Sequence, residues 1–183
     1  NMKEKLALAL FTALLLAVTA SAQVTVEDAA RSALKVGGTI PAFTLNDASG
    51  KPVASGDLMK QGNLVIVFYR GAWCPFCNAY LNKLQKNLTR IKESGGVLVA
   101  ISVENADRST AIAKKNELTY TVLSDPNLAT ARKFGLVYQM ADDLAARYKS
   151  GGLDVAKYNS MEKPELPISA TYVVDKKGKV IFA

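Results

Sequence analysis

The 183-residue sequence predicts a single α/β domain, and three features support this fold class. The chain is long enough for one well-buried core, and it contains 49% hydrophobic against 21% charged residues. Short apolar, β-branched runs at 63–69, 97–103 and 120–125 alternate with stretches of helical periodicity. Alternating strands and helices favour a mostly parallel sheet with right-handed crossovers.

Residues 1–22 are typical of a secretory signal peptide. Two lysines precede an apolar run at 6–18, and Ala20-Ser21-Ala22 forms a small-x-small cleavage pattern. The run is short for a transmembrane span, and no cysteine follows it that could carry a lipid. We expect a secreted, periplasmic domain at 23–183 with no stable membrane anchor once processed. An N-terminal anchor, or a helix packed on the domain, remains the alternative.

The mature chain opens with a helix and a hairpin. Thr25 and Asp28 have the spacing of a capping box, which predicts the start of a helix within 24–35. Two short strands around a turn at 46–50 predict the hairpin, because the turn is rich in Asn, Asp, Ser and Gly. The run at 63–69 follows as a buried central strand.

The remaining elements follow from periodicity and from turn residues. The expected order is a long helix from the cysteine pair to Gly95-Gly96, a strand at 97–103, a helix at 106–118, a strand at 120–125, a helix at 126–135, an inserted helix and loop at 139–166, and a hairpin turned by residues 175–178. No helix follows Ala183 to cover that face of the sheet. We therefore expect the chain to be a truncated version of a longer product.

Composition narrows the range of function. There is no histidine, which excludes Ser-His and Cys-His nucleophile pairs and removes the usual nitrogen ligand for metals. The formal net charge is +7, but the lysines are scattered along amphipathic stretches instead of forming one block. We therefore expect no nucleic-acid partner.

Cys74 and Cys77 are the two cysteines of the chain, and they lie at a strand-to-helix junction. A helix N-terminus favours a thiolate, so we expect Cys74 to be the activated sulfur. Cys77 lies one turn later, close enough to form a disulfide with Cys74. A structural disulfide across two residues would restrain the unfolded chain very little. A zinc site would need about four ligands. A metal or partner-binding module remains the non-enzymatic alternative, and we predict no metal site.

Three segments carry a family resemblance: "KVGGTIPAFTLNDASGKPV", "VFYRGAWCPFCNAYLNKLQ" and "ATYVVDKKGKVIFA". Together they resemble the peroxiredoxin-like branch of the thioredoxin superfamily, the alkyl hydroperoxide reductase and thiol-specific antioxidant group, over residues 35–183. The resemblance implies a thioredoxin-like α/β fold, with a central mixed sheet flanked by helices, and a thiol redox activity. The C-terminal helix of such a fold has no counterpart in the sequence.

The resemblance assigns opposite roles to the two sulfurs. The peroxidatic position of peroxiredoxins falls on Cys77, with Cys74 where that family has threonine, whereas thioredoxin-like reductases attack with the first cysteine, Cys74. The family's later arginine, and the cis-proline of thioredoxins, both fall on Ser169. Arg70 stands where peroxiredoxins have proline, and it either supplies a replacement positive charge or is a solvated residue at a strand end.

Three further residues complete the candidate site. Glu104, at the end of a strand, is the nearest substitute for the buried acid of thioredoxins, and an ordinary surface carboxylate is the alternative. Trp73 either lines the substrate surface or simply packs. Pro75 suits the first helical turn and should affect disulfide stability.

We therefore predict a thiol-disulfide oxidoreductase in which Cys74 attacks first. The alternative is a thiol peroxidase with Cys77 peroxidatic and Cys74 resolving. Either enzyme needs an external dithiol as electron donor and takes a protein disulfide or a peroxide as substrate. Neither needs a bound cofactor.

Overall fold

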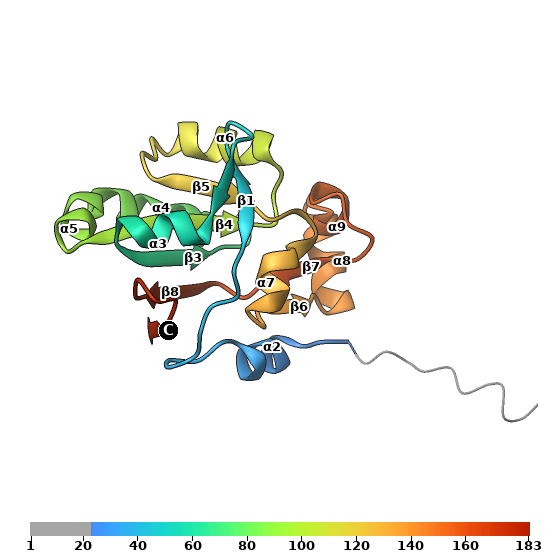
Figure 1. Ribbon diagram of the computed structural model, residues 1–183. Coiled ribbons are helices and arrows are strands. Elements are labelled where there is room, and N and C mark those ends of the chain that lie inside the picture. Colours follow the sequence, from blue (N-terminus) through green and yellow to red (C-terminus); the bar gives the residue numbers. More distant parts are fainter. Residues whose placement is uncertain (1–22) are drawn as a thin grey trace, which may run out of the picture.

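The computed structural model describes residues 23–183 (Figure 1). The predicted signal peptide at 1–22 lies outside the described residues. The elements are α2 (Val26–Ser32), β1 (Thr44–Asp47), β2 (Pro52–Ala54), α3 (Ser55–Gln61), β3 (Asn63–Phe68), α4 (Pro75–Lys86), α5 (Leu88–Glu93), β4 (Gly96–Ser102), α6 (Ala106–Lys115), β5 (Thr121–Ser124), η1 (Pro126–Leu128), α7 (Ala129–Lys133), β6 (Val137–Gln139), α8 (Asp142–Ser150), α9 (Val155–Tyr158), β7 (Glu165–Pro167), β8 (Ala170–Val174) and β9 (Val180–Phe182).

The central sheet is mixed and has the strand order β2-β1-β5-β4-β3-β8-β9. Only the pairs β3–β4 and β4–β5 are parallel, and the other pairs are antiparallel. The prediction of a mixed sheet flanked by helices is confirmed, but the expectation of a mostly parallel sheet holds only for the three central strands. These three are joined by helical crossovers, whereas both outer pairs, β1–β2 and β8–β9, are hairpins.

Two hydrophobic clusters lie on opposite faces of this sheet. Leu81 of α4 and Ile112 of α6 pack with Val67 of β3 in one cluster. The other cluster contains Phe68, Phe134 and Tyr172, whose ring centroids lie 5.0 to 6.3 Å apart. The β3 strand therefore supplies both faces, as expected for a strand that is covered on each side.

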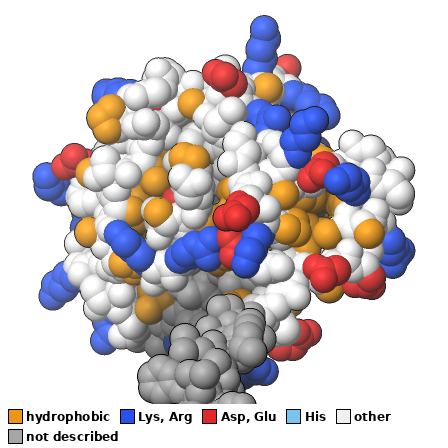
Figure 2. Space-filling model, turned by 90° about the vertical axis from the view of Figure 1, so that its right-hand side faces the viewer, with side chains coloured by type: hydrophobic (Ala, Val, Ile, Leu, Met, Phe, Trp, Pro, Cys, Tyr) orange, Lys and Arg blue, Asp and Glu red, His pale blue; other side chains and the backbone are white. Residues whose placement is uncertain are grey.

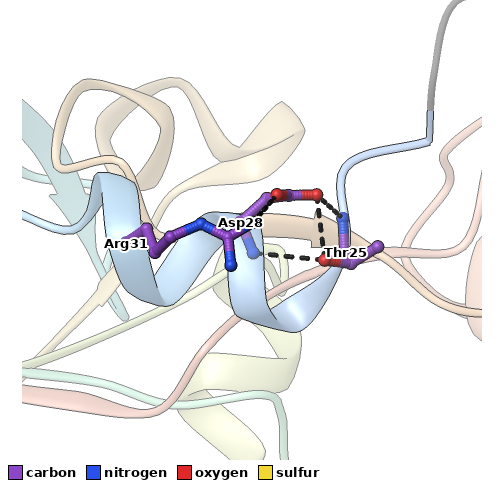
Figure 3. Close-up of polar contacts among 3 residues, drawn as sticks. All are labelled: Thr25, Asp28 and Arg31. Atoms are coloured by element: carbon purple, nitrogen blue, oxygen red, sulfur yellow. Dashed lines mark hydrogen bonds and ion pairs between the residues drawn. The ribbon is translucent and has the colours of Figure 1, made fainter.

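The N-terminal helix begins as predicted. The Thr25 hydroxyl accepts a hydrogen bond from the backbone N–H of Asp28 at 3.1 Å, and the backbone N–H of Thr25 donates to Asp28 Oδ2 at 3.0 Å. Arg31 forms an ion pair with the same carboxylate (Figure 3). This reciprocal capping satisfies two backbone donors that the helix itself leaves free.

Three segments differ from the prediction. The long helix is interrupted at Asn87, between α4 and α5. The expected helix at 126–135 divides into η1 and α7, because Asn127 and Leu128 adopt left-handed backbone angles. The segment 139–166 holds two helices, and its ends pair as the small sheet β6–β7. Strands of three residues are too short to show an alternating pattern.

The charged side chains are scattered over the surface, as the sequence predicts. On the face turned to the viewer in Figure 2, Lys and Arg side chains lie among Asp and Glu side chains without forming one basic patch. Within residues 23–183, no helix is long and apolar enough to cross a membrane.

Candidate functional site

The cysteine pair lies where β3 leads into α4. Residues 70–74, here called the redox turn, connect the end of the central strand to the helix, and Cys74 is the N-cap of α4. Gly71 has a φ of +149°, and a Cβ at this position would lie 2.6 Å from Trp73 Nε1. Pro75 occupies the first turn of α4, where its missing N–H costs no helical hydrogen bond. The turn therefore requires glycine at 71 and tolerates proline at 75.

Two donors surround the sulfur of Cys74. Arg70 Nη2 donates to Cys74 Sγ at 3.1 Å, and the backbone N–H of Cys77 donates to the same atom at 3.4 Å. Burial opposes the charged form, but hydrogen bonds from the side chain and backbone of Cys77, together with the Arg70 charge, hold the pKa of Cys74 below its usual value. The expectation of a thiolate-favouring position at 74 agrees with this geometry.

Cys77 faces a cavity, and Cys74 does not. The cavity has a volume of about 300 Å³. Its lining consists of Phe68, Tyr69, Arg70, Phe76, Cys77, Tyr80, Ser169, Ala170 and Thr171. Cys77 is 6% exposed and Cys74 only 1%. Burial and the hydrogen bond with Cys74 raise the pKa of Cys77, which Arg70 partly offsets. The cysteine that lines the cavity is therefore the one with the higher pKa.

Arg70 connects the two sulfurs to the cavity. Arg70 lines the cavity together with Ser169, and Ser169 is the position where the resemblance places an arginine. Burial disfavours its charge, yet the neighbouring Cys74 and Cys77 sulfurs raise the pKa of the guanidinium. The interpretation of Arg70 as a solvated strand-end residue is wrong, because its side chain is directed at Cys74 and lies 5.7 Å from the Trp73 ring centre.

Trp73 packs away from the cavity. Its ring meets Tyr148 of α8 edge-on, with centroids 5.6 Å apart. Trp73 is not among the residues that line the Cys77 cavity. The packing interpretation of Trp73 therefore describes the structure better than the substrate-lining one.

Glu104 is buried, and its interpretation as a surface carboxylate is wrong. It lies two residues beyond β4 and is 0% exposed. Its Oε2 accepts a hydrogen bond from the backbone N–H of Ala72 at 2.9 Å, so it contacts the redox turn. Burial raises its pKa, while the hydrogen bond from the backbone N–H of Ala72 acts in the opposite direction.

The structure adds residues that the sequence did not single out. Phe76 is 79% exposed beside Cys77, and Tyr80 forms a 3.1 Å hydrogen bond with the Thr171 hydroxyl at the cavity wall. Helical spacing from Cys77 could have indicated Tyr80. Thr171 could be found only through the β3–β8 pairing, in which Phe68 lies opposite Ala170.

The described residues show no metal-binding cluster. Within 23–183, no group of three or more His, Cys, Asp or Glu side chains is placed to hold an ion.

Comparison with known proteins identifies the family of this chain. Residues 36–183 match the AhpC/TSA family. The chain is 29% identical over 139 residues to a chloroplastic peroxiredoxin Q of Sedum lineare, covering 74% of each protein. It is 30% identical over 103 residues to peroxiredoxin Bcp of Escherichia coli K12, covering 56% of this chain and 65% of the relative.

A similar fold occurs among solved structures. Peroxidoxin BcpB of Mycobacterium tuberculosis superimposes with a TM-score of 0.66 at 23% identity, covering 80% of this chain and 82% of that one. The thioredoxin-like fold and the peroxiredoxin-like resemblance are thereby confirmed. The chain belongs to the AhpC/TSA family.

Proposed function

We propose that this protein is a thiol peroxidase in which Cys77 attacks the peroxide and Cys74 resolves the intermediate. The observation that carries the proposal is that Cys77 and Arg70 line the cavity, whereas Cys74 is buried and does not. Family membership and the similarity to proteins named peroxiredoxins support the same chemistry. This proposal reverses the order of attack that helix geometry alone favours.

The first negative charge of the reduced pair lies on Cys74, whose pKa is the lower of the two. Cys74 and Cys77 shift each other's pKa in opposite directions, so the pair titrates as a unit. Transfer of the proton from Cys77 to Cys74 places the thiolate at the cavity. Arg70 is adjacent to both sulfurs and stabilises the anion at either position.

The chemical steps balance with one proton taken from solvent. The Cys77 thiolate attacks the terminal peroxide oxygen, the O–O bond breaks, and the Cys74 thiol protonates the departing alkoxide or hydroxide. Cys77 is now a sulfenic acid, and Cys74 is again a thiolate. The Cys74 thiolate attacks the Cys77 sulfur, the S–O bond breaks, and the departing hydroxide takes a proton from solvent and leaves as water. The product is a Cys74–Cys77 disulfide.

Resolution requires little rearrangement, because the backbone N–H of Cys77 already lies 3.4 Å from Cys74 Sγ. The two residues are the N-cap and the third residue of α4, so the disulfide can close within the first turn. The chain has only two cysteines, and the disulfide must therefore be reduced by an external dithiol.

The test is the site of sulfenic acid formation. Reduced Cys74→Ser protein receives one equivalent of hydrogen peroxide in the presence of dimedone, and its peptides are mapped by mass spectrometry. We expect the adduct on the peptide that carries Cys77. Cys77→Ser, the matched control, should form little adduct in the same time. An adduct on Cys74 in the control, with none on Cys77, would overturn the order of attack.

A disulfide oxidoreductase with Cys74 as nucleophile is the second candidate. The lowered pKa of Cys74 at the N-terminus of α4 favours it. In that enzyme Cys77→Ser would trap a mixed disulfide with a protein substrate through Cys74. A trapped mixed disulfide in Cys77→Ser, without sulfenic acid at Cys77 in Cys74→Ser, identifies this second activity.

We also propose that the enzyme acts after export, in the periplasm. The proposal rests on the signal-peptide pattern of residues 1–22. N-terminal sequencing of protein from a periplasmic extract should give a start at Gln23. Recovery of the intact N-terminus in the cytoplasmic fraction would contradict it.

A further inference from the structure

The backbone of the redox turn is held by side chains on both sides of Ala72. Glu104 Oε2 accepts from the N–H of Ala72, while Asn78 Nδ2 donates to its carbonyl oxygen at 2.7 Å. The same Asn78 nitrogen donates to the carbonyl oxygen of Cys74 at 2.9 Å. The side-chain amide of Asn78 thus links Ala72, in the middle of the redox turn, to Cys74.

Asn78 is itself fixed from the neighbouring helix. Asn116, which ends α6, donates from Nδ2 to Asn78 Oδ1 at 2.8 Å. Asn116 Oδ1 in turn accepts from Asn82 Nδ2 at 3.1 Å. Because the oxygen of Asn78 is occupied by Asn116, its nitrogen is directed to the two carbonyl groups. The three asparagines form a chain of hydrogen bonds from α6 to the redox turn.

We propose that Asn78 is a positioning residue that holds the redox turn so that the Cys74 sulfur stays within reach of its two donors. Asn78 does not line the cavity, so it acts through its hydrogen bonds to the backbone of Ala72 and Cys74. This inference rests on the proposed function only in taking Cys74 as a member of the reactive pair.

The geometry around Cys74 explains why such positioning matters. The hydrogen bond from the Cys77 backbone N–H is already long at 3.4 Å, and the Arg70 contact is 3.1 Å. Hydrogen bonds to a charged sulfur lengthen and weaken when the turn moves by a fraction of an ångström. Loss of the Asn78 side chain frees the carbonyl group of Ala72 and leaves that of Cys74 with only the backbone N–H of Asn78. We therefore expect it to destabilise the Cys74 thiolate more than it destabilises the fold.

Asn82 provides a matched control. It lies one turn further along α4 and binds the same Asn116 side chain, but it has no hydrogen bond to the redox turn. Asn82→Ala therefore removes the same chemical group from the same helix and the same network. A merely structural role of these asparagines predicts similar results for Asn78→Ala and Asn82→Ala.

The experiment measures the Cys74 thiolate directly. In a Cys77→Ser background, absorbance at 240 nm is followed against pH for Asn78→Ala, Asn82→Ala and the unsubstituted parent, and urea unfolding is measured on the same samples. No peroxide is present, so a failure of the peroxidase proposal leaves this test valid. We expect the thiolate fraction at a fixed pH below the midpoint to fall about tenfold in Asn78→Ala and less than twofold in Asn82→Ala.

A second variant covers the case in which Asn78→Ala fails to fold. Asn116→Ala leaves the Asn78 side chain in place but removes the donor that orients it, so a smaller fall in the same direction is expected. Equal falls in Asn78→Ala and Asn82→Ala would overturn the proposal. An unchanged thiolate titration in both Asn78→Ala and Asn116→Ala would do the same.

Discussion

Removing the positive charge of Arg70 should slow the reaction with peroxide by about 30-fold. The Arg70 Nη2 to Cys74 Sγ distance is 3.1 Å. A pair of unit charges at this separation interacts by about 1.3 kcal/mol in bulk water and by about 5 kcal/mol at an effective dielectric constant of about 20. Arg70 is only partly buried, so solvent screens the contact and the lower part of this range applies.

A charge-assisted hydrogen bond contributes about 1.5–3 kcal/mol. About 2 kcal/mol for Arg70→Met corresponds to about a 30-fold loss of thiolate or of rate near neutral pH. Stopped-flow fluorescence of Trp73, the one tryptophan of the chain, can follow the reduced protein as it meets peroxide. Because the Arg70 charge lies 5.7 Å from the indole centre, the amplitude should change as well.

Two variants control this measurement. Arg70→Lys keeps the charge but loses the planar guanidinium, so an intermediate rate is expected. Arg90→Met removes the same charge from α5, remote from the sulfurs in sequence, and should leave the rate unchanged. The reasoning is refuted if Arg70→Met reacts within twofold of the parent while its fold is intact.

Three other substitutions test the site. Glu104→Gln should make the free energy of unfolding less dependent on pH. In the parent the folded-state pKa of Glu104 is raised, so the protonated carboxyl stabilises the fold at low pH, and this stability is lost as pH rises from the unfolded pKa of about 4.5 through the folded pKa. Urea unfolding should therefore show the stability of the variant increasing relative to the parent as pH rises through this window. Gly71→Ala places a Cβ 2.6 Å from Trp73 Nε1 at a φ of +149°, and thermal unfolding should report a loss of about 1–3 kcal/mol, whereas Gly56→Ala, with open space at its Cβ, should cost much less. Leu81→Ala, in the cluster beneath α4, should lower the free energy of unfolding by about 2–5 kcal/mol, and a loss below 1 kcal/mol would contradict the packing described.

Much of the fold follows from local patterns in the sequence. Thr25 and Asp28 predict the start of α2 because both capping partners lie within four residues. The runs around β3, β4 and β5 predict buried strands because their apolar character is continuous. The interruption at Asn87 was missed, since Leu88 and Ile91 continue the helical spacing across it.

The sequence predicts which residues form the site but not how they are arranged around the cavity. The Cys-Pro-Phe-Cys spacing identifies the sulfurs, yet which of them meets the cavity depends on residues 169–171, which β8 brings beside β3. Asn78 gave no signal, because its partner Asn116 lies 38 positions away on another helix. The burial of Glu104 likewise gave no signal, because its hydrogen-bond partner Ala72 lies 32 positions away.

The order of attack is tested most directly by the rate at which each single-cysteine variant consumes peroxide. Reduced Cys74→Ser and Cys77→Ser proteins are each mixed with one equivalent of hydrogen peroxide, and the remaining peroxide is measured with time. The account predicts that Cys74→Ser still consumes one equivalent of peroxide, because Cys77 and Arg70 remain at the cavity, but more slowly than the parent, because Cys74 no longer accepts the Cys77 proton. Cys77→Ser should react more slowly than Cys74→Ser, because Cys74 does not line the cavity although its pKa is lowered. Fast consumption by Cys77→Ser together with slow consumption by Cys74→Ser would contradict the account.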